Sequence, residues 1–146
     1  MQGRVLAVDP GSKRIGLAIS DPMGKIASPL AVIRHTSMDE DCEKISQVCR
    51  QYEVTLVILG YSPGSEGEEN AQMRHSLKLA ERLREKLSVP VELWDETGST
   101  QQARTGMLLS GSRKKERSGH LDEHAAAVIL QSYLYGKDEE KTIDTP

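Results

Sequence analysis

Three short apolar segments follow one another within the first 34 residues of the chain, with only a few residues between them. They predict strands over Arg4–Asp9, Ile15–Ser20 and Ile26–Arg34. Parallel strands need a crossover connection of about a dozen residues or more, so segments this close together pair as an antiparallel meander. Pro29 lacks a backbone N–H, which favours an edge position for the third strand.

Helical and strand patterns alternate in the rest of the chain. The predicted elements are a helix over Met38–Tyr52, a strand over Thr55–Leu59, a helix over Glu68–Leu87, a strand over Val89–Asp95, and helices over Thr100–Leu109 and Leu121–Tyr135. Right-handed crossovers bring the two later strands into the sheet on the side of the first strand. We therefore expect an α/β fold, in which a five-stranded mixed sheet (an antiparallel meander plus two parallel crossover strands) has helices on both faces.

The length and composition restrict the class of protein. The 146 residues fit one domain, which we expect over residues 1–136, followed by a frayed acidic tail over residues 137–146. The net charge of −3 argues against a general polyanion-binding protein, so a contact with nucleic acid must come from a local basic patch. No apolar run reaches the roughly 18–20 residues of a membrane span, and we expect a cytoplasmic protein without a membrane partner. Cys42 and Cys49 lie about two helical turns apart, too far to bridge each other.

Four acidic residues stand where the predicted elements end or begin. Asp9 ends the first strand, Asp95 and Glu96 end the fifth, and Asp122 opens the final helix. Carboxylates gathered at one sheet edge repel each other unless a cation joins them, and hard ions such as Mg²⁺ or Mn²⁺ prefer oxygen ligands. Each acid also has a simpler explanation, because Asp is favoured in turns after strands and in the first turn of a helix. The spacing alone therefore suggests a metal site without establishing one.

Several segments, in order along the chain, resemble a single protein family. They are Val8–Asp21 (VDPGSKRIGLAISD), Ile58–Gly60, the loop ending at Glu66-Gly67, Leu93–Glu96 with Ser99-Thr100, and Asp122 with Ala125-Ala126 through Leu134. Together they are similar to the family of pre-16S ribosomal RNA nucleases, which is also described as Holliday junction resolvase-like and belongs to the RNase H-like superfamily. The fold of that family is the five-stranded mixed sheet expected above.

The resemblance implies a metal-dependent nuclease that hydrolyses phosphodiester bonds in structured nucleic acid. Its expected substrate is the 5′ end of precursor 16S rRNA, with branched DNA as a second. The resemblance assigns Asp9, Glu96 and Asp122 as the catalytic and metal-binding residues for Mg²⁺ or Mn²⁺. Asp95 is the alternative to Glu96, because only one of two neighbours on a strand faces a given side. The expected assembly is a monomer or a weak dimer.

Two loops depart from the pattern of the family. Gly60-Tyr61-Ser62 stands where the family usually has Gly-Leu-Pro, and Asp95-Glu96-Thr97-Gly98 where it usually has Asp-Glu-Arg-Leu. An arginine in the second loop would touch phosphate or orient an acid, so its absence bears on substrate affinity or identity. The acids themselves are retained.

Two clusters of basic residues are candidates for phosphate contacts. Lys13 and Arg14 follow Asp9 in a predicted turn, where they either hold phosphate or form a solvated hairpin tip. The second cluster is a loop before Asp122 with a net charge of +3 in five residues, formed by Arg113, Lys114, Lys115, Glu116 and Arg117. A basic run is usually only a solvated loop, but its position beside the predicted acids favours contact with phosphate.

Two other functions stay open on the sequence alone. The altered loops are compatible with a non-catalytic module that binds RNA or DNA junctions. Asp9 and Gly11, followed by Gly16, also resemble the phosphate-binding hairpin of actin-like ATPases and sugar kinases. Those proteins close two lobes over a nucleotide, whereas 146 residues supply one lobe.

Overall fold

The computed structural model describes residues 3–11, 13–61, 71–95 and 124–136 of the chain. Its elements are β1 (Arg4–Pro10), β2 (Arg14–Ser20), β3 (Ala27–Arg34), α1 (Met38–Gln51), β4 (Val54–Tyr61), α2 (Ala71–Lys86) and β5 (Val91–Asp95). A further helix covers residues 124–136. The five predicted strands and the helices before and after β4 are confirmed. The helix predicted over Thr100–Leu109 and the predicted tail lie outside the described residues.

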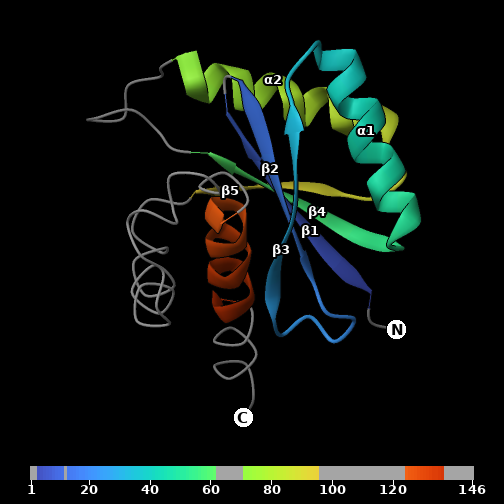
Figure 1. Ribbon diagram of the computed structural model, residues 1–146, viewed down its shortest axis with the longest axis vertical. Helices are drawn as coiled ribbons and strands as arrows, with labels where there is room; N and C mark the ends of the chain where they lie inside the picture. The colour runs from blue at the N-terminus through green and yellow to red at the C-terminus, as the bar shows by residue number, and fades with distance from the viewer. Residues whose placement is uncertain (1–2, 12, 62–70, 96–123, 137–146) are drawn as a thin grey trace.

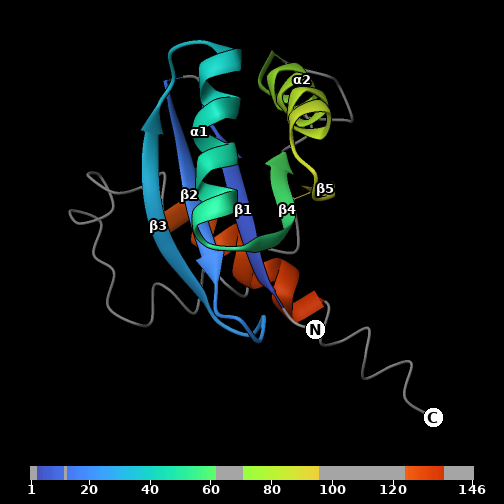
Figure 2. The same cartoon turned by 90° about the vertical axis from the view of Figure 1, so that its right-hand side faces the viewer.

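The strands form one mixed sheet in the order β3-β2-β1-β4-β5 (Figure 2). β2 pairs antiparallel with both β1 and β3, whereas β4 is parallel to β1 and β5 is parallel to β4. The predicted meander and the two crossover strands are therefore confirmed. β1 takes the central position because Leu6, Ala7 and Val8 are apolar in succession, and all three are fully buried between two layers.

Helices cover both faces of the sheet (Figure 1). α1 and α2 pack on one face, and the helix at residues 124–136 packs on the other. We call these the α1/α2 face and the 124–136 face. α1 begins where the Ser37 side chain accepts a hydrogen bond from the backbone N–H of Glu40, which satisfies a donor that the helix leaves open. An apolar stripe of α1 packs toward the sheet and consists of Ile45, Val48 and Cys49, with Tyr52 immediately after the helix.

The helix at residues 124–136 is tied to the start of the edge strand β3. The Gln131 side chain accepts a hydrogen bond from the Ala27 N–H at 3.1 Å and donates one to the Lys25 carbonyl at 3.2 Å. Pro29 follows two residues after Ala27, and the sheet order confirms that its strand lies at an edge.

Cys42 and Cys49 are both free and buried on α1. Within the residues that the structure describes, no helix is both long and apolar enough to cross a bilayer.

Candidate functional site

The carboxyl ends of β1, β4 and β5 lie at the same edge of the sheet, because these three strands are parallel. Asp9 is the second-last residue of β1, and Asp95 is the last residue of β5. β4 runs between them. Adjacent strands lie about 4.8 Å apart, so the backbones of β1 and β5 are about 10 Å apart across the sheet.

Asp9 and Asp95 nevertheless belong to opposite faces of the sheet. Side chains alternate along a strand, and Ala7 of β1 packs in the core of the 124–136 face. Asp9, two residues further on, therefore belongs to the 124–136 face, where it is partly buried. Trp94 of β5 also packs on that face, so the next residue, Asp95, belongs to the α1/α2 face and is exposed.

Asp9 is flanked by glycines on both neighbouring strands. Gly16 of β2 is its partner in the antiparallel ladder. The parallel ladder pairs Val8 with Leu59, and one further step along both strands brings Gly60 beside Asp9. Neither neighbouring strand therefore places a side chain next to the Asp9 carboxylate. We call Gly16, Asp9 and Gly60 the glycine rung.

The layer that covers this face also contains small residues. Ala126 and Ala127 of the helix are buried in one cluster with Ala7 and Ala18 of the sheet. Small side chains on both layers allow a helix to lie close to a sheet. The chain enters this helix by residue 124, two residues after Asp122.

A tight turn joins β1 to β2 next to Asp9. The Gly11 N–H donates a hydrogen bond to the Arg14 carbonyl at 2.9 Å. A Cβ atom on Gly11 would lie only 2.4 Å from that carbonyl oxygen, so the turn needs a residue without a side chain. This turn brings the predicted phosphate-binding residues Lys13 and Arg14 close to the glycine rung.

A hollow of about 360 Å³ lies beside the turn, lined by Lys13, Arg14, Val32 and Arg34. The ladder between β2 and β3 pairs Arg14 with Arg34, and Gly16 with Val32. Arg14 and Arg34 therefore share the face of Gly16, which is the face of Asp9. Arg14 is two residues from Gly16, which puts its Cα about 8 Å from that of Asp9. We call these four residues the cationic hollow.

Arg34 is the basic member of the cationic hollow that the sequence does not predict. It ends an edge strand and looks like any exposed charged residue, and only the register of β3 on β2 brings it opposite Arg14. Its guanidinium and the Lys13 ammonium form no hydrogen bond or ion pair with another residue in the described part of the chain.

His35, Asp41 and His75 form a second cluster, on the α1/α2 face. The His35 N–H donates to the Lys13 carbonyl at 2.9 Å, while its ring Nδ1 contacts the Asp41 carboxylate, which is buried and also accepts from the Thr36 N–H at 3.3 Å. The His35 and His75 rings meet edge to face, with centroids 5.7 Å apart. Burial lowers the pKa of His75, His35 lowers it further, and Asp41 opposes both effects. The cluster holds the end of β3 against α1, and no spacing in the sequence predicts it.

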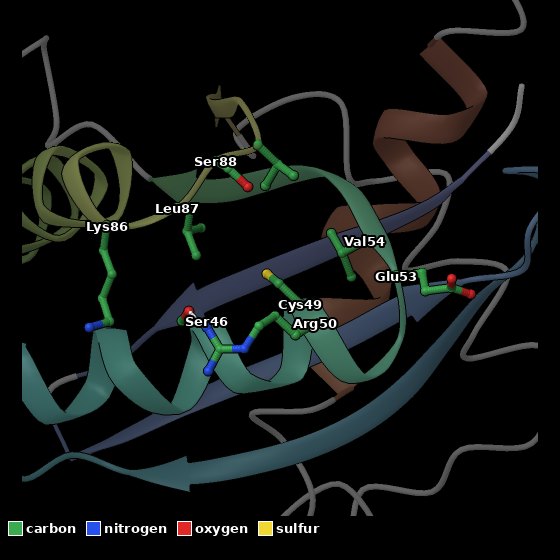
Figure 3. Close-up of a pocket in the computed structure, with 9 residues that line it drawn as sticks. Ser46, Cys49, Arg50, Glu53, Val54, Lys86, Leu87 and Ser88 are labelled. Atoms are coloured by element: carbon green, nitrogen blue, oxygen red, sulfur yellow. Dashed lines mark hydrogen bonds between the residues drawn. The ribbon is translucent and has the colours of Figure 1, made fainter.

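Another hollow, of about 270 Å³, lies near the start of β4, between the carboxyl ends of α1 and α2 (Figure 3). Its two cations already have partners, since Arg50 donates to the Ser46 hydroxyl at 2.8 Å and Lys86 pairs with Glu43 at 2.6 Å. Burial raises the pKa of the Cys49 thiol to about 11, so this thiol is protonated and unreactive at neutral pH. The two cations of this hollow therefore differ from Lys13 and Arg34 of the cationic hollow, which have no such partner among the described residues.

Asp9 supplies one carboxylate suited to a hard metal ion. Among the described residues, no group of three or more His, Cys, Asp or Glu side chains could hold a metal. The predicted partners Glu96 and Asp122 lie outside those residues, as do the basic loop residues Arg113, Lys114, Lys115 and Arg117.

The chain matches a known family over most of its length. The family model described as "RuvX: Holliday junction resolvase" matches residues 3–136. A protein of Anaeromyxobacter sp. (strain Fw109-5) is 39% identical over 134 residues, which are 92% of this chain and 98% of that protein. A protein of Clostridium acetobutylicum is 34% identical over 131 residues, which are 90% and 97% of the two chains. Both are named "Putative pre-16S rRNA nuclease".

Solved structures share the fold at low sequence identity. Thermus thermophilus RuvC in complex with a Holliday junction substrate is similar with a TM-score of 0.65 and 17% identity, over 94% of this chain and 96% of that one. The Holliday junction resolvase of fowlpox virus gives a TM-score of 0.53 and 16% identity, over 91% and 99%. The fold is thus the RNase H-like fold of RuvC-like resolvases, as the sequence predicts.

Proposed function

The chain belongs to the RuvX family of Holliday junction resolvases, and from this membership we propose that it is a metal-dependent nuclease of structured nucleic acid. The observation that carries the proposal is the position of Asp9. Its partly buried carboxylate lies between two glycines and on the same face as the cationic hollow. A carboxylate that can bind a cation and a hollow that can hold phosphate are thus joined by one turn of the chain.

Asp9, Glu96 and Asp122 form the proposed site for Mg²⁺ or Mn²⁺. Alternation along β5 supports Glu96 over Asp95, because Asp95 belongs to the face opposite Asp9 and the next side chain of an extended strand would turn back. Asp122 precedes the helix of the 124–136 face by two residues, which supports its part in the same site. Divalent ions in such a site activate a water molecule and stabilise the leaving oxygen of a phosphodiester.

The remaining proposed residues bind and orient the substrate. Lys13 and Arg14 hold phosphate beside Asp9, because the Gly11 turn fixes them there. The absence of side chains at Gly16 and Gly60 lets a nucleic-acid backbone approach the Asp9 carboxylate. The basic loop adds phosphate contacts through Arg113, Lys114, Lys115 and Arg117.

We propose precursor 16S rRNA as the substrate, because the relatives compared above are named pre-16S rRNA nucleases, and its 5′ end as the processed part, as the resemblance implies. Branched DNA is the second substrate, supported by the description of the family model. The protein then acts in the cytoplasm as a monomer or weak dimer. The actin-like alternative gains no support from the family match.

The test is cleavage of a labelled precursor 16S rRNA fragment and of a four-way DNA junction, each with Mg²⁺, Mn²⁺ or a chelator. Cleavage is expected with metal and not with chelator. Asp9→Asn and Glu96→Gln should abolish it, and Asp95→Asn should retain it. Glu85→Gln, an exposed acid on α2, is the matched control for the loss of one negative charge. Cleavage that survives Asp9→Asn, or that needs Asp95 in place of Glu96, would contradict the proposed site.

A non-catalytic binding function is the second candidate, favoured by the departures at Tyr61-Ser62 and Thr97-Gly98. It predicts metal-independent binding of the same substrates, measured by titration, and no cleavage under any of the conditions above.

A further inference from the structure

Arg14 and Arg34 lie directly opposite each other on β2 and β3. Such partners have Cβ atoms about 4.5–5.5 Å apart, and like charges at this spacing destabilise a sheet. Lys13 adds a third positive charge to the same hollow. An anion bound in the hollow would offset the repulsion between these like charges.

The Arg34 side chain is available for a ligand. It is exposed, and its guanidinium has no hydrogen-bond or ion-pair partner among the residues described. A guanidinium presents five N–H donors in a planar fork that matches two oxygens of a phosphate. Lys13 contributes an exposed ammonium from the adjacent turn.

The hollow stands at a defined place relative to Asp9. Asp9, Gly16 and Val32 lie side by side on β1, β2 and β3, and Arg14 and Arg34 lie two residues further toward the turn. The Asp9 and Arg14 backbones are therefore about 8 Å apart, and the Asp9 and Arg34 backbones about 12 Å apart. A phosphate held in the hollow would leave its neighbour beside Asp9.

The rim of the hollow is fixed before any ligand arrives. The backbone of His35, next to Arg34, is bonded to the Lys13 carbonyl, and the His35 ring contacts the buried Asp41 carboxylate of α1. The ends of β2 and β3 are thereby held together on the α1/α2 face. Preorganisation of this kind reduces the entropy lost on binding.

We propose that Arg34 is a substrate-binding residue, and that the cationic hollow holds the phosphate next to the cleaved one on the same strand. This inference rests on the proposed nuclease function and deepens it, because it adds a binding residue from the edge strand and gives the direction in which the backbone crosses the sheet, from β1 toward β3. The hollow recognises phosphate and no base, so its contribution is independent of sequence.

The experiment compares Arg34→Gln and Arg34→Lys with wild type. The control is Arg82→Gln, which removes an exposed arginine of α2 that pairs with Asp39 at 2.5 Å. Cleavage kinetics give kcat and KM, and titrations in chelator at several salt concentrations give Kd. Arg34→Gln should raise KM and Kd about ten- to a hundredfold, as for one charge-assisted hydrogen-bonded contact, with kcat unchanged because the contact is remote from the reacting atoms.

The salt dependence separates a phosphate contact from a structural role. Arg34→Gln should lower the slope of log Kd against log salt by about 0.7–0.9, the value for one phosphate contact. Arg34→Lys should keep the slope and recover part of the affinity, because it keeps the charge and loses the fork. Arg82→Gln should leave the slope and KM at wild-type values.

Two failures can be told apart. An unchanged slope and KM in Arg34→Gln, or a loss of thermal stability with an unchanged slope, overturns the role of Arg34 even when Asp9→Asn is inactive. Cleavage that survives Asp9→Asn overturns the proposed function, while the slopes measured in chelator still report on Arg34.

Discussion

The two faces of the sheet differ in the size of the side chains that cover them. The α1/α2 face is packed with large aliphatic residues, several of them without exposed surface, such as Leu6, Ile45, Leu59, Leu79 and Leu83. The 124–136 face combines larger residues of its helix with four buried alanines, Ala7, Ala18, Ala126 and Ala127, and with the glycine rung. One backbone thus has a face filled by large side chains and a face on which the two strands beside a carboxylate carry glycine.

The difference teaches how a small α/β domain separates stability from function. Buried aliphatic area stabilises the fold in proportion to its size, so removing it on the α1/α2 face costs free energy of unfolding. Small residues contribute less buried area, so changes at the glycine rung should affect activity more than stability.

The largest effect is expected for Asp9→Asn, on the 124–136 face. Cleavage should fall by at least about a thousandfold, or about 4 kcal/mol in the barrier, because a proposed metal ligand is lost. The melting temperature without metal should hold or rise, since removing one carboxylate relieves repulsion within the proposed acidic trio. Added Mn²⁺ should raise the melting temperature of wild type more than that of the variant. An equal response to metal in both proteins would exclude Asp9 as a ligand.

Leu83→Ala, on the α1/α2 face, should have the largest effect on stability. Leu83 is fully buried on α2, and truncation should lower the free energy of unfolding by about 2–5 kcal/mol in urea denaturation. The cleavage rate of the folded variant should equal that of wild type. Leu77→Ala, at a partly exposed position of the same helix, is the matched control and should cost less. A similar cost at both positions would show that the α1/α2 face is not the main source of stability.

Gly16→Ala tests whether the glycine rung must stay open. The added methyl group lies beside Asp9 and should displace the substrate, lowering cleavage by up to about a hundredfold. The free energy of unfolding should fall by no more than about 3 kcal/mol, because Gly16 is buried in β2 and an extra methyl group in a packed site costs about 1–3 kcal/mol. Full activity in this variant would remove the link between small residues and access to Asp9.

The smallest effect concerns pH and belongs to the α1/α2 face. The pKa of His75 is lowered in the folded protein, mainly by burial, so between that lowered value and about 6.5 the unfolded chain binds more protons than the folded one. The contribution of neutral His75 to the free energy of unfolding is therefore fully present above about pH 6.5 and decreases as the pH falls below that value. His75→Phe should weaken the decline in melting temperature between pH 7.5 and pH 5. An identical pH profile in both proteins would assign the decline to other groups.

Much of the fold follows from the sequence because its strands are short apolar runs joined by connections that leave few choices. The three strands before α1 can only form a meander, and Pro29 already indicates an edge. Asp9 is visible for a similar reason, since it ends the most apolar strand immediately before a glycine turn.

The parts of the site that escape prediction depend on register and on helix packing. A shift of one residue in the pairing of two strands moves every side chain of a strand to the other face. The separation of Asp9 from Asp95 and the pairing of Arg14 with Arg34 therefore cannot be predicted without the observed register of the strands. The contact of His75 with His35 requires the packing of α2 beside the start of α1, which no local pattern encodes.

An edge strand with free backbone donors can be extended by a strand of another molecule, which is a common route to aggregation. β3 is such an edge, yet the Ala27 N–H is already bonded to Gln131, and Pro29 has no N–H to offer. N–H groups on one side of a strand recur at every second residue, so these two positions are consecutive on that side. The glutamine that fastens the helix to the sheet, together with Pro29, therefore also removes two donor positions at the start of β3 that a strand of another molecule could use.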